Sequence, residues 1–106
     1  MELLTRLEEA ILIAVLRLGD EAYGVAVNLE VSRMFGKAYT LGALYFALDQ
    51  LVRKEYLGKR LGESSAQRGG KSKTYYRLTP EGNEALSAVR AHQLRIWKTV
   101  PKTTMV

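Results

Sequence analysis

The sequence predicts a mostly helical fold that carries one small β-hairpin. Apolar residues recur at helical spacing in three successive segments and again after residue 80, whereas residues 59–63 and 73–78 alternate as strands do. The chain has 106 residues, of which 47% are hydrophobic and 25% charged, and this is the size and composition of one globular domain. We therefore expect three helices, a hairpin and a fourth helix around one modest core.

The first helix is predicted from Leu3 to Leu18, and Gly19 supplies its C-terminal stop. One apolar stripe of this segment suits the core of the chain. Leu12, Ile13 and Leu16 form a second apolar face, so the segment needs burial on two sides. In so small a protein, we expect another subunit to cover the second side.

The second helix is predicted over residues 22–35, and Gly36 closes it. After a tight connection, Thr40 is the expected N-cap of a third helix that runs to Leu57, with Gly58 in the C-cap position. The inward stripe of this third helix is Leu44, Leu48, Leu51 and Val52. The residues opposite this stripe are left to face outward.

The hairpin is predicted from two alternating segments, Lys59–Glu63 and Lys73–Leu78, joined by the polar, glycine-containing stretch Ser64–Ser72. Thr79 then offers an N-cap and Pro80 suits the first helical position, so a fourth helix is expected to begin here.

Three short helices followed by a two-stranded hairpin form the winged helix-turn-helix order, in which the third helix enters the major groove and the hairpin reaches the flanking backbone. The charges agree with this layout: residues 53–77 hold eight basic and two acidic residues, a surplus of six against a net charge of +5 for the whole chain. A cationic hairpin gains affinity for DNA by releasing condensed counterions. A hairpin kept soluble by its charge is the alternative, and the helix order favours DNA.

The third helix turns one face away from its core stripe, and this face is expected in the major groove. Gln50 suits the hydrogen-bonding edge of adenine, and Phe46 and Ala43 suit thymine methyl groups. For Phe46, packing against the wing or a partner subunit is an equal alternative. Tyr45 lies at the edge of the stripe, where its ring packs and its hydroxyl reaches phosphate. The predicted DNA-binding residues are Tyr39, Thr40, Gly42, Ala43, Tyr45, Phe46, Gln50, Arg68, Lys71 and Lys73.

Residues suited to other chemistry are scarce. The chain has no cysteine, which excludes disulfides, thiol catalysis and cysteine-ligated zinc and favours a reducing, cytoplasmic location. His92 is the single histidine, so neither a metal site nor a catalytic triad is predicted. No signal peptide, membrane span or cofactor is expected either. We therefore predict that the protein is not an enzyme.

The sequence resembles the PadR family of winged helix-turn-helix transcriptional regulators over residues 7–86. The motifs that carry this resemblance are Tyr23-Gly24, Gly42-Ala43-Leu44-Tyr45-Phe46-Ala47-Leu48 with Leu51, Arg68-Gly69-Gly70, and Tyr75-Tyr76-Arg77-Leu78-Thr79-Pro80-Glu81-Gly82. The last of these is the most specific. Each fragment is weak by itself, but their order and spacing together indicate the family.

The resemblance implies a homodimer that represses transcription from a near-palindromic operator on double-stranded DNA. The shortest members of the family dimerise through the first helix and a single C-terminal helix, which agrees with the two-sided apolar surface of residues 3–18. Many members release DNA when a small aromatic or drug-like effector binds. The chain is accordingly expected to divide into a winged-helix domain over 1–79, a dimerisation helix over 80–100 and a flexible tail over 101–106.

Trp97 has two interpretations within such a dimer. It is either an anchor of the dimer core or a flat wall of an effector pocket between the subunits. Both predict the same burial, so the sequence does not separate them. The predicted interface residues are Leu4, Leu12, Ile13, Leu16, Leu86, Val89, Ile96 and Trp97.

Two departures from the family pattern lie in the third helix. The family often has proline or arginine at the position of Phe46, and basic residues at the positions of Asp49 and Gln50. This unusually apolar and partly acidic helix motivates a second hypothesis, a winged-helix protein-interaction module that does not bind DNA.

Overall fold

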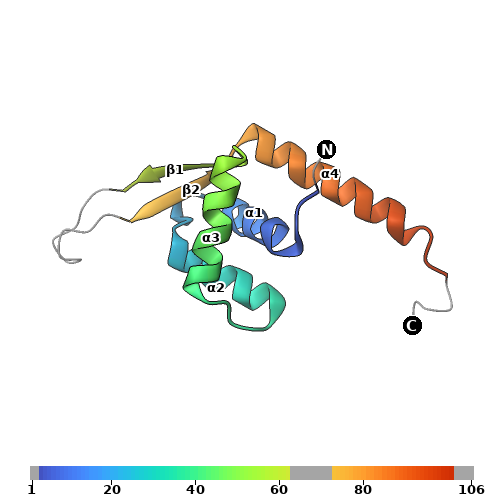
Figure 1. The fold of residues 1–106 in the computed structure, drawn as a ribbon, viewed down its shortest axis with the longest axis horizontal. Coiled ribbons are helices and arrows are strands. Elements are labelled where there is room, and N and C mark those ends of the chain that lie inside the picture. Colours follow the sequence, from blue (N-terminus) through green and yellow to red (C-terminus); the bar gives the residue numbers. More distant parts are fainter. Residues whose placement is uncertain (1–2, 63–72, 102–106) are drawn as a thin grey trace.

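The computed structural model describes residues 3–62 and 73–101 of the chain. Its elements in chain order are α1 (Arg6–Leu18), the short 3-10 helix η1 (Gly19–Glu21), α2 (Gly24–Phe35), α3 (Leu41–Arg53), β1 (Leu57–Leu61), β2 (Thr74–Leu78) and α4 (Pro80–Trp97). Figure 1 shows α1, α2 and α3 gathered in one body, with the hairpin extending to one side and α4 to the other. The predicted class, mostly helical with a small hairpin, is confirmed. None of the described helices is long and apolar enough to cross a membrane.

The core lies among α1, α2 and α3, and the first residue of β1 closes it. Its largest fully buried side chains are Ile11, Leu12, Val15, Val27, Val31, Leu44, Leu48, Leu51 and Leu57. Burial of each such side chain stabilises the fold by about 1.5–3 kcal/mol relative to exposure. The expectation that Leu12 faces a partner subunit is wrong, because the chain itself buries this residue completely.

Threonine caps begin three of the helices. Thr5 and Glu8 form a reciprocal capping box, with N···O distances of 2.9 and 3.0 Å, so α1 begins three residues later than the predicted start at Leu3. Thr40 and Thr79 each accept a hydrogen bond from the backbone amide three residues on, as their sequence context predicts. These starts are therefore fixed by local sequence.

α3 ends at Arg53, before the predicted end at Leu57, and Gly58 lies in β1 instead of capping the helix. The chain turns at Glu55, which adopts a left-handed φ of 65°. The Thr79 hydroxyl donates a hydrogen bond of 2.6 Å to the carbonyl oxygen of Glu55, so the start of α4 holds this turn. An apolar residue at position 57 suits a helix stripe and a buried strand equally, and the turn decides in favour of the strand.

The hairpin is tied to the segment before α2. β1 and β2 pair antiparallel, with Arg60 opposite Tyr75. The backbone amide of Tyr76 donates to the carbonyl oxygen of Ala22 at 2.8 Å, and Tyr23 forms an isolated bridge with Tyr75. The base of the hairpin is therefore held against the helical body, and its orientation relative to α3 is set.

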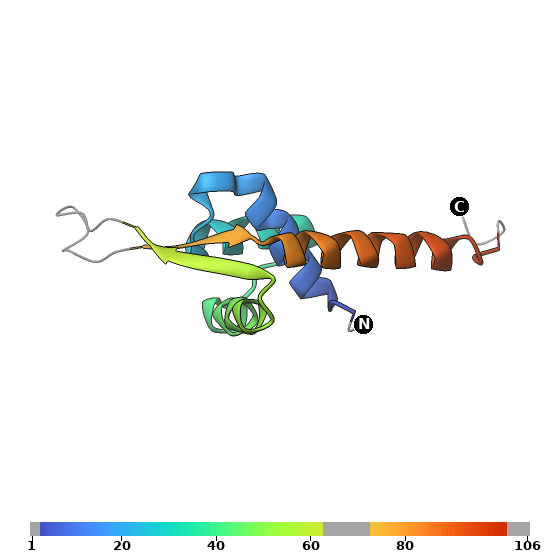
Figure 2. The ribbon, with the colours of Figure 1, turned by 90° about the horizontal axis from the view of Figure 1, so that it is seen from above.

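α4 packs on the body with its N-terminal half. Ala85 and Val89 are buried there, and a Cβ atom on Gly82 would collide with the carbonyl oxygen of Tyr56, so this close approach requires glycine. The C-terminal half extends away from the body (Figure 2), and Trp97 is 56% exposed. α4 thus presents an apolar end that the other described residues do not cover.

Candidate nucleic-acid interface

The outer face of α3 lies open to solvent. Its opposite face, which includes Leu44 and Leu48, is buried in the core, so the helix has a fixed rotation about its axis. Phe46 is 67% exposed on the outer face. Of the other residues predicted here, Thr40, Gly42, Ala43 and Tyr45 are exposed, and Tyr39 and Gln50 are half-buried. The structure therefore places every predicted residue of this helix at the surface of one face or at its edge.

A hydrogen-bonded turn positions the N-terminal end of α3. The Tyr39 amide donates to the Ser32 hydroxyl at 3.2 Å, and that hydroxyl donates to the Asn28 side-chain oxygen at 3.1 Å. The Asn28 side-chain nitrogen returns a hydrogen bond to the Tyr39 carbonyl oxygen at 3.3 Å. This closed set of hydrogen bonds fixes the connection between α2 and α3, which the sequence showed only as a short loop.

An ion pair fastens the C-terminal end of α3 to α1. Lys54 Nζ donates to Glu8 Oε2 at 2.8 Å, and Glu8 is only 7% exposed. Burial alone raises the pKa of Glu8, but the Lys54 hydrogen bond and the backbone hydrogen bond of Thr5 outweigh it and lower the pKa below its usual value. Glu8 is therefore ionised at neutral pH and holds α3 against α1.

A shallow pocket lies between the start of α2, α3 and the outer end of the hairpin, where β2 begins. The Tyr45 hydroxyl packs so close to Gly24 that a Cβ atom there would collide with it. Lys73 Nζ lies 3.7 Å from the centroid of the Tyr23 ring, a cation–π contact that holds the ammonium group at the pocket. The lining residues are Tyr23, Gly24, Val25, Tyr45, Lys73 and Thr74. A hydroxyl donor and an ammonium group that line the same pocket suit one phosphate of a nucleic acid backbone.

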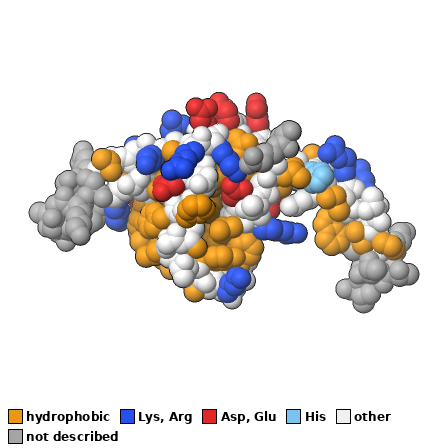
Figure 3. All heavy atoms as spheres, viewed as in Figure 1, with side chains coloured by type: hydrophobic (Ala, Val, Ile, Leu, Met, Phe, Trp, Pro, Cys, Tyr) orange, Lys and Arg blue, Asp and Glu red, His pale blue; other side chains and the backbone are white. Residues whose placement is uncertain are grey.

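The hairpin carries further cations beyond this pocket. Lys59, Arg60 and Arg77 are exposed, and the Arg60 guanidinium carbon lies 4.6 Å from the centroid of the Tyr75 ring. Arg68 and Lys71, which were predicted to contact DNA, lie outside the described residues. Figure 3 shows hydrophobic side chains over α3 and Lys and Arg side chains along the edge where α3 leads into β1. One face of the molecule thus combines an apolar helix with a basic border.

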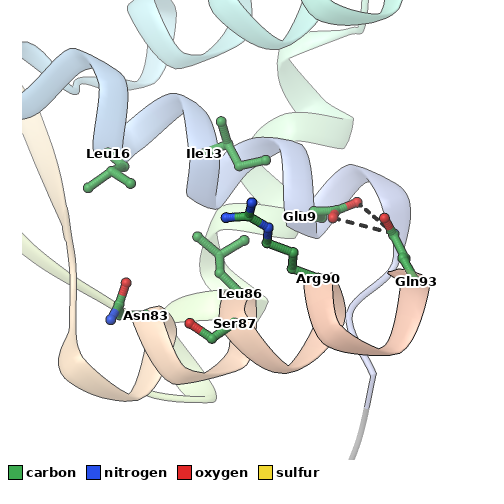
Figure 4. A pocket seen from close by; sticks show the side chains of 8 residues that line it. All are labelled: Glu9, Ile13, Leu16, Asn83, Leu86, Ser87, Arg90 and Gln93. Carbon is green, nitrogen blue, oxygen red and sulfur yellow. Dashed lines mark hydrogen bonds between the residues drawn. The ribbon is translucent and has the colours of Figure 1, made fainter. Parts of the chain in front are cut away.

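A second candidate surface is an open groove of about 390 Å³ between α1 and α4. Figure 4 shows the side chains that line it. The predicted interface residues Ile13, Leu16 and Leu86 line it. Polar groups border it as well: Gln93 donates to the Glu9 carboxylate at 3.4 Å, and the Arg90 side chain extends toward α1. The groove therefore offers an apolar floor with charged edges.

The remaining predicted interface residues differ in their exposure to solvent. Ile96 and Trp97 are at least half exposed on the free end of α4, and Leu4 is half-buried. Val89 is 5% exposed, so the chain itself already covers it, as it covers Leu12, and the assignment of Val89 to a subunit interface is corrected. Among the described residues, no three His, Asp or Glu side chains are grouped as a metal site.

The contacts that sequence reasoning missed join residues far apart in the chain. The spacing of Thr5 and Glu8 is typical of a capping box and could have predicted one. The ion pair of Glu8 with Lys54 could not be predicted in this way, because 46 positions separate the two residues. The contacts of Lys73 with Tyr23 and of Tyr45 with Gly24 likewise left no local signal.

Comparisons with known proteins agree with this geometry. The model of the transcriptional regulator PadR-like family matches residues 11–88. A PadR-like transcription factor from Bacteroides fragilis has 26% sequence identity and a TM-score of 0.71, over 88% of this chain and 84% of that chain. RosR from H. salinarum has 28% identity and a TM-score of 0.66, over 93% of this chain and 82% of that chain. A PadR family regulator from Clostridium difficile, at 23% identity, shares the fold with a TM-score of 0.65, over 93% of this chain and 98% of that chain. The search of curated proteins gave no match.

Proposed function

This chain belongs to the transcriptional regulator PadR-like family, and from that membership we propose that it acts as a homodimeric repressor of a near-palindromic operator. Its relatives are transcription regulators and not enzymes, and the chain is a DNA-binding regulator of the same kind. The proposal assigns DNA binding to residues 1–79 and dimerisation to residues 80–100 together with α1.

The observation that carries the proposal is the shared face of α3 and the outer end of the hairpin. The hydrogen bonds at Tyr39 and the ion pair at Lys54 hold α3 at both ends, so its outer face is presented as a rigid unit. Tyr45 and Lys73 lie between this face and the wing. We assign the helix to the major groove and these two side chains to the adjacent backbone phosphates, because phosphate contacts fix the register from which bases are read.

Two uncovered apolar surfaces support the homodimer. The groove between α1 and α4 lacks a covering element in the described chain, and the free end of α4 exposes Leu94, Ile96 and Trp97. In a two-fold pair, the free end of each α4 covers the groove of the other copy. Both apolar surfaces are then buried in one interface. Such a dimer spaces two α3 helices for two half-sites of one operator.

Release by an effector is the finer part of the proposal. Trp97 is 56% exposed in the single chain, and pairing of two copies places its ring between subunits, where a planar aromatic compound is able to stack on it. Titration of Trp97 fluorescence with a panel of planar aromatic compounds tests this. Quenching that accompanies DNA release supports an effector site, and an unchanged emission across the panel leaves Trp97 as a packing residue.

The test of DNA binding is a salt-dependent anisotropy titration against the upstream region of the protein's own gene. Lys73→Ala, and Arg68→Ala combined with Lys71→Ala, are expected to weaken binding and to lower the slope of log affinity against log salt by roughly 0.9 for each phosphate that the variant no longer neutralises. Arg33→Ala, on α2, removes one positive charge outside both the wing and α4 and is the matched control. If the control lowers affinity as much as the wing variants, the assignment of the wing is wrong.

A second function is favoured by the apolar surface over α3 in Figure 3, which also suits a protein-interaction module. Phe46→Arg separates the two functions because it adds a cation to the outer face of α3. Loss of discrimination between operator and scrambled duplex supports the repressor. A gain of DNA affinity together with loss of a bound protein partner supports the module.

A further inference from the structure

We propose that α3 recognises the 5-methyl groups of thymine in each half-site, and that Phe46 distinguishes a pyrimidine that carries this methyl group from one that lacks it. The inference rests on the proposed function, since it requires α3 to lie in the major groove. Thymine methyl groups project into that groove, where an apolar side chain contacts them directly.

The position of Phe46 on α3 suits a direct base contact. It lies on the side of the helix opposite the buried Leu44 and Leu48, and its side chain is 67% exposed. Gly42, one turn earlier on the same face, is exposed and has open space beyond its Cα atom. Phe46 is therefore the most exposed large hydrophobic residue of α3, and it lies beside a glycine whose missing side chain lets the helix approach base edges closely.

The charges of α3 disfavour recognition of guanine. Bidentate contacts to guanine are made mainly by Arg and Lys, and α3 contains neither residue before Arg53 at its last position. Asp49 is the acid of this helix, and it lies toward β2: after burial, its carboxylate is the main cause that raises the pKa of Tyr76 on that strand. The rest of the outer face is neutral, so the favourable contacts left to it are apolar contacts and amide hydrogen bonds.

The neighbours of Phe46 on α3 are apolar. Phe46 shares a shallow hollow with Ala43 and Ala47 of its own helix and with Leu7 of α1. Gln50 borders the hollow at the next turn, and Thr5 and the ion-paired Glu8 complete its lining on the α1 side. A methyl group placed against Phe46 and Ala43 would leave water for an apolar surface. Gln50 is then one turn away, where its amide matches the N6 and N7 atoms of an adenine. The half-site implied by this arrangement is rich in A·T pairs.

The experiment begins with selection of duplexes from a random library by the intact protein. The enriched duplex is then synthesised with single thymines replaced by deoxyuridine, which removes the 5-methyl group and leaves base pairing unchanged. Loss of one buried methyl group is expected to weaken binding about fourfold, and loss in both half-sites about fifteenfold. The dissociation constants are measured by fluorescence anisotropy at one fixed salt concentration.

Phe46→Ala assigns the effect to this residue. It is expected to bind the thymine duplex about as weakly as the wild type binds the deoxyuridine duplex, and to lose the difference between the two duplexes. Lys59→Ala, on the exposed face of β1, is the control: it lowers affinity for both duplexes by the same factor. Unchanged thermal melting of Phe46→Ala shows that the fold is intact, as expected for an exposed side chain.

The outcomes separate this inference from the proposed function. An enriched duplex that tolerates deoxyuridine at every position, or a Phe46→Ala variant that keeps the full thymine preference, overturns methyl recognition and leaves the repressor standing. An enriched half-site made of G·C pairs does the same. Failure to enrich any duplex overturns both.

Discussion

Disruption of the Glu8–Lys54 ion pair offers a stringent test of how α3 is held. In Lys54→Met, Glu8, which is only 7% exposed in the wild type, loses the ammonium group that lies 2.8 Å from its carboxylate. Removing one partner of a fully buried pair costs about 3–5 kcal/mol, and a surface pair is worth about 0–1 kcal/mol. Lys54 retains 28% side-chain exposure, so we expect an intermediate loss of about 2 kcal/mol in the free energy of unfolding at pH 7.

A double-mutant cycle with Glu8→Gln isolates the pair from the other contacts of Lys54. Glutamine keeps the capping box with Thr5, so α1 retains its N-terminal cap in this variant. Chemical denaturation is measured for the four proteins at one protomer concentration, because the stability of a dimer depends on concentration. A coupling free energy of about 1–2 kcal/mol at pH 7 is expected.

The pH dependence of that coupling has a definite sign. The pKa of Glu8 is lowered in the folded chain, so the stability it contributes is present above its unfolded value, near 4.5, and is lost as the pH falls through the lower folded value. In Lys54→Met, burial of Glu8 is no longer opposed by the ammonium group, so the variant loses less stability than the wild type as the medium is acidified. A coupling free energy near zero at pH 7, or one that does not shrink below pH 4.5, would refute the reasoning.

Three further variants test the fold, the phosphate contact and the dimer. Gly82→Ala places a Cβ atom against the main-chain oxygen of the turn after α3 and is expected to cost about 1–3 kcal/mol in thermal unfolding, whereas Gly42→Ala, which faces open space, costs nothing. Tyr45→Phe removes a phosphate-directed hydroxyl and should weaken binding to all duplexes about fivefold, as seen by anisotropy. Trp97→Ala should raise the dimer dissociation constant at least thirtyfold, roughly 2 kcal/mol, in sedimentation equilibrium, while the equally exposed Leu29→Ala on α2 leaves it unchanged.

The parts of the fold that the sequence predicts correctly depend on nearby residues. Thr40 and Thr79 cap the helices that follow them because the acceptor and the amide lie three positions apart. The end of α3 depends instead on the Thr79 hydroxyl bound to the carbonyl oxygen of Glu55, 24 positions away. Apolar periodicity alone predicts a helix that continues to Leu57. The hydrogen bond that ends the helix joins residues far apart in the sequence, so no neighbouring residue indicates it.

For the candidate site, too, the sequence predicted what depends on helical spacing and not what depends on the packing of separate elements. Helical spacing indicated the outward face of α3, since the core stripe through Leu44 and Leu48 fixes what lies opposite. The same spacing showed two apolar faces on α1 but did not tell which of them the chain covers. Leu12 is buried and Leu16 is 58% exposed, because the placement of the packed elements, which periodicity does not encode, decides between them.

The most direct test of the account is the stoichiometry and selectivity of the complex with DNA, measured by sedimentation velocity with a labelled duplex. The account predicts a complex of two chains on the operator duplex, formed at a salt concentration at which a scrambled duplex of equal length stays free. A single chain per duplex, or equal occupancy of operator and scrambled duplexes, would contradict it.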